Sequence, residues 1–270
     1  MIELPEREDA LCFDINDSPG TILNLVRDPA SGFLVNGEIV AKKQNKAAAS
    51  GQVNTYFGRL GVVHQTLGVR LEVTTEDISL SQDGQRVKLL WSDKASLKGP
   101  SVNLTLTKNT CLTLTLRDCI RFRVVRHTKV WRNRHDQQDY LGFYTLESHR
   151  LSQEVHGLLG QFYHGVGFEV GPLRPGEVPD KPDATMFVKG HQLNVTSPGR
   201  PWFTVHDSYG ALLGTTLKRF LKTAQSWHRD FRKDVKNGEN VPCWFVHSNG
   251  TGLIDGSASD YTVSGLFKTV

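Results

Sequence analysis

LTLTL, residues 112–116, alternates leucine and threonine, so every second side chain is apolar. Successive side chains of a β-strand point to opposite faces, and strict alternation therefore predicts a strand with one buried and one solvent-facing side. VRLEV, residues 69–73, repeats the pattern. Between residues 11 and 146 such segments recur with few helical candidates, which predicts a strand-rich unit.

Glycine dipeptides and prolines mark the expected ends of these strands. Asn36-Gly37 lies inside the apolar run 33–40 and predicts a two-residue hairpin turn, because type I′ turns need positive φ at both central positions. Asp83-Gly84 and Lys189-Gly190 are expected to separate further strands. The proline-dense segment 171–183 can sustain neither a helix nor a central strand and predicts a long loop.

One stretch, residues 211–226, follows a helical period instead. Leu213, Leu217, Phe220 and Leu221 fall on one face of a helix. Such a basic amphipathic helix packs its apolar stripe on a sheet or, alternatively, binds a membrane or a partner's groove. We therefore expect a mainly β fold, an antiparallel sandwich or barrel, with one inserted amphipathic helix near 211–226.

Length and charge narrow the functional classes. We treat residues 1–270 as a single domain, because all-β domains often reach this size undivided. The formal net charge of +4 at pH 7 is a mild bias toward acidic partners, and we expect no nucleic-acid binding. No run of about 18 apolar residues occurs, so we expect no membrane span.

Several features favour the extracellular space. Four Asn-x-Ser/Thr tripeptides are candidate N-glycosylation sites, at Asn16, Asn103, Asn194 and Asn249. The N-terminal residues lack the pattern of a signal peptide. An extracellular location would therefore require a signal upstream of Met1, and we expect the chain to derive from a longer, secreted precursor.

The four cysteines are even in number, as pairing in a secreted protein requires. Cys12 and Cys243, near the two ends of the sequence, are the candidate disulfide. Cys111 and Cys119 would lie roughly 26 Å apart in one extended strand, and a disulfide needs Cα atoms within about 7 Å. We do not expect these two to pair.

EVHGLLGQFYH, residues 154–164, raises the question of a metal or catalytic site, because His156 and His164 bracket it. The sequence has no His-Glu-x-x-His, Cys-x-x-Cys, Gly-x-Ser-x-Gly or phosphate-binding loop motif, so we predict no catalytic residue, metal or cofactor. A spatial Ser-His-Asp arrangement stays open. We expect a turn in which Gly157 and Gly160 adopt angles closed to other residues, anchored by Phe162 and a neighbouring leucine.

The stretch 117–134 is strongly basic, with seven Lys/Arg against one acid. As a strand, it would place Arg121, Arg123, His127 and Lys129 on one face, and guanidinium rows match carboxylate or sulfate oxygens. A solvated outer face is the alternative. The candidate glycan-binding residues are Arg121, Arg123, Arg126, Lys129 and Arg132.

Several segments together resemble one known family. They are Cys12-Phe13-Asp14-Ile15-Asn16, Thr55-Tyr56-Phe57-Gly58-Arg59-Leu60-Gly61, Asp139-Tyr140-Leu141-Gly142-Phe143-Tyr144, His156-Gly157-Leu158-Leu159-Gly160-Gln161-Phe162, Cys243-Trp244-Phe245-Val246-His247 and Leu253-Ile254-Asp255-Gly256. In this order they are similar to the C-terminal domain of the inter-alpha-trypsin inhibitor heavy chains. The resemblance covers about 11–196 and 227–267, and residues 197–225 look like an insertion.

The resemblance implies a non-catalytic module of a secreted precursor whose C-terminal part is removed at an Asp-Pro-His-Phe site. The exposed Asp becomes ester-linked to chondroitin sulfate and is transferred to hyaluronan, and the family is associated with protease inhibition through its partner bikunin. Hyaluronan or chondroitin sulfate is thus the expected partner. By this resemblance, we expect the sequence to start after the ester-forming Asp and to lack counterparts of the upstream domains, and Cys111 and Cys119 do not fit the family's cysteine pattern.

Three other functional hypotheses stay open. A direct serine-protease inhibitor would need an exposed, rigid loop offering Arg174 or Arg200 to the protease. An enzyme that makes or breaks the glycan ester would need paired catalytic groups. A weaker resemblance of residues 157–162 to the Gly-Leu-Cys-Gly-Asn-Phe turn of von Willebrand type D modules, with Leu159 in place of the cysteine, suggests a structural interaction module.

Overall fold

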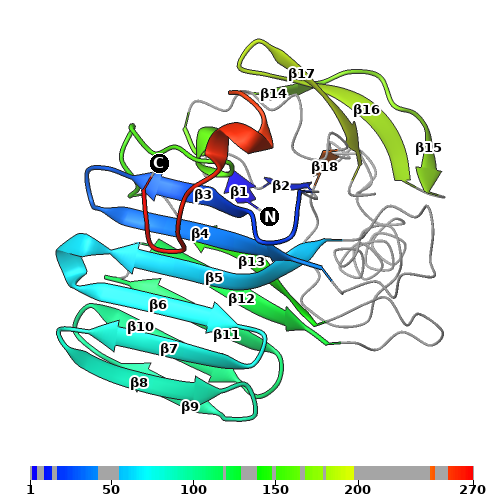
Figure 1. Ribbon diagram of the computed structural model, residues 1–270. Helices are drawn as coiled ribbons and strands as arrows, with labels where there is room; N and C mark the ends of the chain where they lie inside the picture. The colour runs from blue at the N-terminus through cyan, green and yellow to red at the C-terminus, as the bar shows by residue number, and fades with distance from the viewer. Residues whose placement is uncertain are drawn as a thin grey trace, which may run out of the picture.

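The structure is a computed structural model, and it shows the mainly β fold that the sequence predicts (Figure 1). It describes residues 2–4, 9–13, 17–41, 55–117, 120–128, 139–147, 150–164, 168–178, 181–197, 244–246 and 255–269. The predicted amphipathic helix at 211–226 lies outside these residues. The division into one domain with an insertion at 197–225 stays a prediction.

Sheet one is an antiparallel meander in which each strand pairs with the next one in sequence. Its strands are β3 (Ile22–Asp28), β4 (Phe33–Val40), β5 (Tyr56–His64), β6 (Val69–Thr74), β7 (Asp77–Gln82) and β8 (Gln85–Leu90). A 3₁₀ turn, η1 (Gln65–Leu67), links β5 to β6.

Sheet two continues the meander behind sheet one in the view of Figure 1. Its strands are β9 (Ala95–Lys98), β10 (Val102–Thr107), β11 (Cys111–Leu116), β12 (Ile120–His127) and β13 (Tyr140–Glu147). Trp91 lies between the two sheets in sequence, is 1% exposed, and donates its indole N–H to the Thr74 carbonyl at 2.8 Å.

The inner faces of the two sheets form one core. LTLTL buries all three of its leucines, and VRLEV buries its two valines and its leucine, as the alternation predicts. Phe33 of sheet one and Phe122 of sheet two meet with ring centroids 6.4 Å apart. The burial of one such residue contributes about 1.5–3 kcal/mol. The pairing of Leu141 on β13 with Phe57 on β5 joins the sheets at one corner, which gives a nearly closed, barrel-like sandwich.

A third group of strands extends the sheet system. It comprises β1 (Ile2–Leu4), β2 (Asp9–Phe13), β14 (Phe168–Val170), β15 (Arg174–Val178), β16 (Lys181–Val188), β17 (His191–Thr196) and β18 (Trp244–Val246). β1 pairs with β13 and β18 with β2 in parallel, and the other pairings of the group are antiparallel. Two further 3₁₀ turns are η2 (Gly160–Phe162) and η3 (Ala258–Tyr261).

The predicted hairpin at Asn36-Gly37 is wrong. β4 runs without interruption through both residues, and Asn36 is fully buried. Its Oδ1 accepts a hydrogen bond from Asn24 Nδ2 at 2.8 Å, and its own Nδ2 lies 2.8 Å from the Lys268 carbonyl. Position 37 requires glycine because of close packing and not because of a turn, since a Cβ there would lie 2.7 Å from the Phe57 ring.

The other turn predictions divide. Asp83-Gly84 and Lys189-Gly190 both have two successive positive φ angles and separate paired strands, as expected. The predicted loop at 171–183 is wrong in part, since β15 lies within it. β15 pairs only with β16 among the described strands and does so with a register shift, so Pro175 occupies the edge position that proline tolerates.

Candidate functional site

The outer face of sheet two is lined by hydroxyl groups and cations. In β10 and β11 the leucines point into the core, so the alternate residues point outward. Cross-strand partners share a face, and the registers of β9 to β12 place eight polar residues together. We call this set the threonine-rich face: Ser96, Lys98, Asn103, Thr105, Thr113, Thr115, Arg121 and Arg123.

The register orders this face into two parallel rows that cross four strands. One row runs Lys98, Asn103, Thr115, Arg121, and the other runs Ser96, Thr105, Thr113, Arg123. Neighbouring strands are about 4.8 Å apart, so the backbones of Lys98 and Arg121 are separated by roughly 14 Å. Across β9 to β12 the two rows include three cations, and on β13 the next positions in register are Glu147 beside Arg121 and Tyr144 beside Arg123.

One hydrogen bond within the face orients an arginine. Arg123 Nε donates to Thr113 Oγ1 at 3.2 Å across the β11–β12 pair. Arg121 and Arg123 are both partly exposed. Guanidinium N–H groups donate to paired oxygens, and threonine hydroxyls donate or accept, so the face suits a carboxylated or sulfated sugar polymer.

The structure separates the predicted basic residues. Arg126 has the same strand parity as Phe122 and Val124, and its Nη2 forms an ion pair with Asp139 Oδ2 at 2.9 Å. His127 does point outward, but it is 4% exposed and stacks on Tyr140 with ring centroids 4.5 Å apart. Lys129 and Arg132 lie outside the described residues. Of the predicted row, Arg121 and Arg123 remain on the threonine-rich face.

Sequence reasoning named only Arg121 and Arg123 as ligand-binding residues and missed the other six members of the threonine-rich face in that role. Lys98, Thr113 and Thr115 come from β9 and β11, and the pairing register brings them beside the arginines. The alternation in LTLTL already indicates that the two threonines point outward. The sequence does not show which strands pair with the strand that carries these two threonines.

The candidate glycosylation sites occupy different places. Asn103 is partly exposed in the threonine-rich face, and Asn194 is exposed on β17. Thr196, the hydroxyl residue of the second tripeptide, is 1% exposed and donates to Asp183 Oδ1. Asn16 and Asn249 lie outside the described residues, so the use of all four sites stays a prediction.

Only some of the four cysteines lie within the described residues. Cys111 is a free, buried thiol that packs with Val125 and Tyr144 on the outer side of sheet two. Cys119 and Cys243 lie outside the described residues. β2 brings the backbone of Cys12 into register with Phe245 of β18, two positions after Cys243 in sequence. The Cys12–Cys243 disulfide stays a prediction.

EVHGLLGQFYH is a turn pinned to β3. The Arg27 N–H donates to the His156 carbonyl at 2.7 Å, and the His156 N–H donates to the Arg27 carbonyl at 2.8 Å. Gly157 has a φ of +110°, as predicted, but Gly160 has no positive φ and that prediction is wrong. The predicted anchors are buried: Leu158, Leu159 and Phe162.

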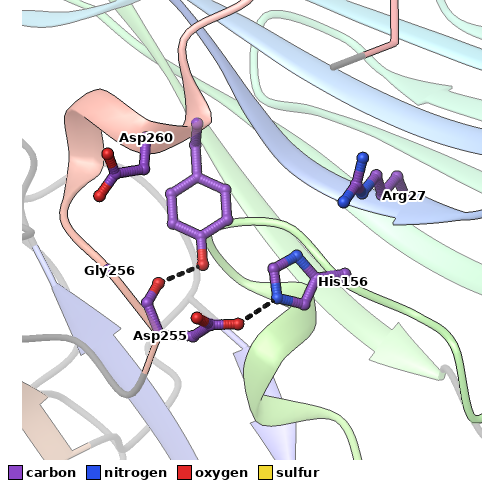
Figure 2. A pocket seen from close by; sticks show the side chains of 6 residues that line it. Arg27, His156, Asp255, Gly256 and Asp260 are labelled. Carbon is purple, nitrogen blue, oxygen red and sulfur yellow. Dashed lines mark hydrogen bonds and ion pairs between the residues drawn. The ribbon is translucent and has the colours of Figure 1, made fainter.

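A pocket of about 230 Å³ opens beside this turn (Figure 2). It is lined by Arg27, His156, Asp255, Gly256, Asp260 and Tyr261. His156 Nε2 lies 2.5 Å from Asp255 Oδ2, and the Tyr261 hydroxyl donates to the Asp255 carbonyl at 2.6 Å. These contacts tie the C-terminal segment, residues 255–269, to the turn.

Two groups in the pocket have shifted pKa values. Burial, reinforced by the nearby Asp255 and Asp260 carboxylates, raises the pKa of Tyr261 to about 12, so its hydroxyl keeps its proton at neutral pH. The Ser257 N–H and hydroxyl donate to Asp260 Oδ2 and lower the pKa of that carboxyl group.

The pocket is best described as a structural clamp. Its described lining includes no serine, threonine or cysteine that a His–Asp pair would activate as a nucleophile. Within the described residues no group of three His, Cys, Asp or Glu side chains could hold a metal ion. We therefore assign no catalytic step to this pocket.

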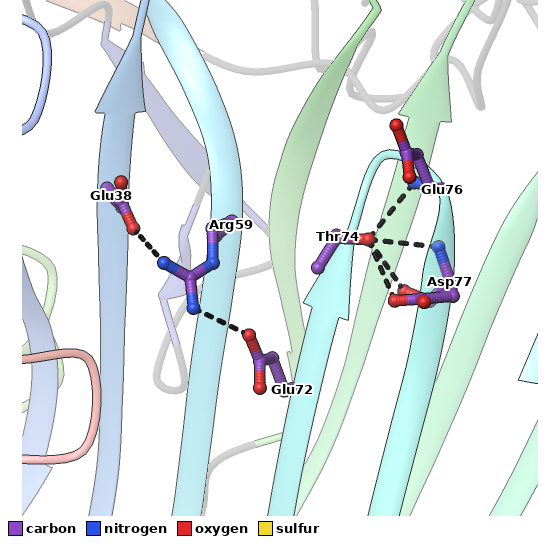
Figure 3. Close-up of polar contacts among 6 residues, drawn as sticks. All are labelled: Glu38, Arg59, Glu72, Thr74, Glu76 and Asp77. Carbon is purple, nitrogen blue, oxygen red and sulfur yellow. Dashed lines mark hydrogen bonds and ion pairs between the residues drawn. The ribbon is translucent and has the colours of Figure 1, made fainter. Parts of the chain in front are cut away.

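The outer face of sheet one differs from the threonine-rich face. Arg59 on β5 contacts Glu38 Oε2 on β4 and Glu72 Oε1 on β6, each at 2.7 Å (Figure 3). Thr74 and Asp77 close the neighbouring β6–β7 turn, where the Asp77 N–H donates to Thr74 Oγ1 at 2.9 Å. At Arg59 a single cation lies between two carboxylates, which disfavours an anionic ligand.

The residues proposed for protease inhibition receive little support. Arg174 is the first residue of β15, where it pairs with Asp183 in register and its Nη2 donates to Thr185 Oγ1 at 3.3 Å. It therefore belongs to a sheet edge and not to a projecting loop. Arg200 lies outside the described residues.

The fold and the threonine-rich face together define a two-sheet β module with a polar, cationic surface on sheet two. Comparison with known proteins identifies the family. The family model that describes the C-terminus of the inter-alpha-trypsin inhibitor heavy chains matches residues 30–210. The protein belongs to the inter-alpha-trypsin inhibitor heavy chain family, as its sequence motifs predict.

Individual relatives agree with this assignment. The protein is 41% identical over 268 residues to inter-alpha-trypsin inhibitor heavy chain H1 of Homo sapiens, covering 99% of this sequence and 26% of the relative. It is 39% identical over 267 residues to heavy chain H3 of Mesocricetus auratus, covering 99% and 27%. It thus spans about a quarter of the length of these relatives. In its described part, no helix is long and apolar enough to cross a membrane.

Proposed function

We propose that this protein is a non-catalytic, extracellular binding module of an inter-alpha-trypsin inhibitor heavy chain. Its ligand is a polyanionic glycan of the matrix, hyaluronan or chondroitin sulfate, and its role is to stabilise hyaluronan-containing matrix. Bikunin is a further partner, reached through a full-length family member. Family membership supports the class of this proposal, and the threonine-rich face supports the ligand.

The observation that carries the proposal is the register that aligns Lys98, Arg121 and Arg123 with three threonines and a serine on one face. These hydroxyls and the arginine N–H groups match the hydroxyl, carboxylate and sulfate oxygens of such glycans. Exposed ionic contacts are individually weak, so affinity comes from several of them acting along an extended polymer.

A binding titration tests the proposal. The unglycosylated protein is titrated at low salt with fluorescent chondroitin sulfate and hyaluronan oligosaccharides. Replacing both Arg121 and Arg123 by alanine should weaken binding about tenfold, because two ionic contacts of about 0.5–1 kcal/mol each are lost. Thermal melting checks that the variant remains folded.

A matched control comes from sheet one. Arg86 Nε donates to Ser79 Oγ at 2.9 Å, a cross-strand contact of the same kind as that of Arg123, and Lys88 lies two residues further along β8. Arg86→Ala with Lys88→Ala removes the same charge and should leave the affinity unchanged. No affinity at low salt, or an equal loss in both double variants, would reject the proposal.

A further inference from the structure

The tripeptide Asn103-Leu104-Thr105 lies within the threonine-rich face itself. We propose that N-glycosylation of Asn103 closes this face to polyanionic glycans, so that the protein exists in a binding and a non-binding glycoform. The inference rests on the proposed function, because it concerns regulation of the same face.

The strand geometry places the asparagine between the cations. Asn103 on β10 pairs in register with Lys98 on one side and with Thr115 on the other, and Thr115 pairs with Arg121. Its backbone is therefore one strand spacing from Lys98 and two spacings, roughly 10 Å, from Arg121. A ligand that contacts Lys98 and Arg121 together has to pass over Asn103.

The Asn103 side chain is accessible for modification, and a glycan attached to it extends outward from sheet two. Leu104 is fully buried, so its neighbours Asn103 and Thr105 both point away from the core, and Thr105 is exposed. A glycan attached to the Asn103 amide leaves the sheet along its normal. It is bulky and hydrated, and it covers the adjacent strands β9 and β11.

Asn194 supplies an internal comparison. It is an exposed asparagine of the same tripeptide type, but it lies on β17 in the third group of strands, at the opposite end of the molecule from β9 and β10 (Figure 1). A glycan on Asn194 leaves the threonine-rich face open. The effect we propose is therefore specific to one of the two described sites.

The test uses the protein secreted from mammalian cells behind a heterologous signal peptide, with site occupancy measured by peptide mass spectrometry. Chondroitin sulfate oligosaccharide is the probe. We expect Asn103 to be occupied, and Asn103→Gln and the enzymatically deglycosylated protein each to bind at least about tenfold more tightly than the occupied form. Asn194→Gln should bind like the parent protein. Adding Arg121→Ala and Arg123→Ala to Asn103→Gln should remove the gain.

The outcomes separate the two proposals. An unoccupied Asn103, or equal binding by the occupied form and Asn103→Gln, overturns the proposal that glycosylation closes the threonine-rich face and leaves the proposed polyanion binding intact. If Asn103→Gln and the enzymatically deglycosylated protein both fail to bind at low salt, the proposed function itself is wrong.

Discussion

Gly157 couples the turn of EVHGLLGQFYH to β3 at the level of single atoms. A Cβ at this position would lie 2.8 Å from both Asn24 Oδ1 and the Leu25 carbonyl, and the φ of +110° is strained for any other residue. We predict that Gly157→Ala lowers the free energy of unfolding by about 2–3 kcal/mol. Urea denaturation measures the change.

Gly160, three residues along the same turn, is the control. Its φ is not positive, and a Cβ there would meet its nearest neighbour at an ordinary 3.6 Å. Gly160→Ala should change stability by less than about 0.5 kcal/mol. Similar costs at the two positions would contradict this description of the turn.

His64 at the end of β5 gives the fold a pH dependence. Burial lowers its pKa, the Arg117 cation lowers it further, and Asp28 opposes the shift only in part. The unfolded state, with a histidine pKa near 6.5, therefore takes up a proton more readily than the fold does. This contribution to stability is present above about pH 6.5 and is lost as pH falls below it.

His64→Gln should accordingly reduce the loss of stability between pH 7.5 and about pH 5.5, measured as urea midpoints at the two values. His191 on β17 is exposed and serves as the comparison. His191→Gln should leave the pH dependence of the parent protein unchanged. An identical pH dependence in His64→Gln and the parent protein would refute the assignment.

At the scale of elements, the C-terminal segment is held on sheet one by one buried amide. Asn36 Nδ2 lies within hydrogen-bond distance of the carbonyls of Gly265, Leu266 and Lys268, at 3.3, 3.2 and 2.8 Å. A Cβ on Gly61 would lie 2.5 Å from the Leu266 carbonyl oxygen, so the segment lies directly against β5. A further contact is the bridge between Thr262 and Leu23.

Asn36→Ala should cost about 2–3 kcal/mol of unfolding free energy, because Asn24 Nδ2 loses its shortest acceptor and the carbonyls of the C-terminal segment lose the buried amide that donates to them. Limited proteolysis should also cut within 255–269 sooner than in the parent protein. The exposed Asn194→Ala is the control and should alter neither. If the C-terminal segment resists protease equally in Asn36→Ala and in the parent protein, Asn36 does not hold it on sheet one.

The elements show how far the sequence alone could lead. Alternation predicted β6 and β11 because one face of each strand is buried and the other is polar. The hairpin prediction at Asn36-Gly37 failed because this dipeptide lies inside a strand. The buried Asn36 side chain there donates to the Leu266 carbonyl, 230 residues away in sequence. Local sequence contains no sign of such a contact.

At the scale of the whole molecule, the same limit explains the candidate site. The basic stretch 117–134 pointed to β12, but only strand pairing shows that Lys98, Thr113 and Thr115 lie beside Arg121 and Arg123. His156 and Asp255 are likewise 99 residues apart in sequence. The family motifs identified the protein, whereas the position of its candidate functional surface required the register.

The two sheets present different surfaces on one scaffold. Sheet one carries the C-terminal segment and the Glu38–Arg59–Glu72 ion pairs, and sheet two carries the threonine-rich face. A polyanion should therefore bind to one side of the sandwich only. Binding should weaken steeply with added salt, since the contacts are exposed charges.

Amide chemical-shift mapping during titration of the unglycosylated protein with a chondroitin sulfate oligosaccharide locates the bound glycan on one face or the other. We predict perturbations concentrated at Lys98, Asn103, Thr115, Arg121 and Arg123, with β6 to β8 unchanged. Perturbations centred on sheet one or on the His156 pocket, or none at saturating oligosaccharide in low salt, would contradict it.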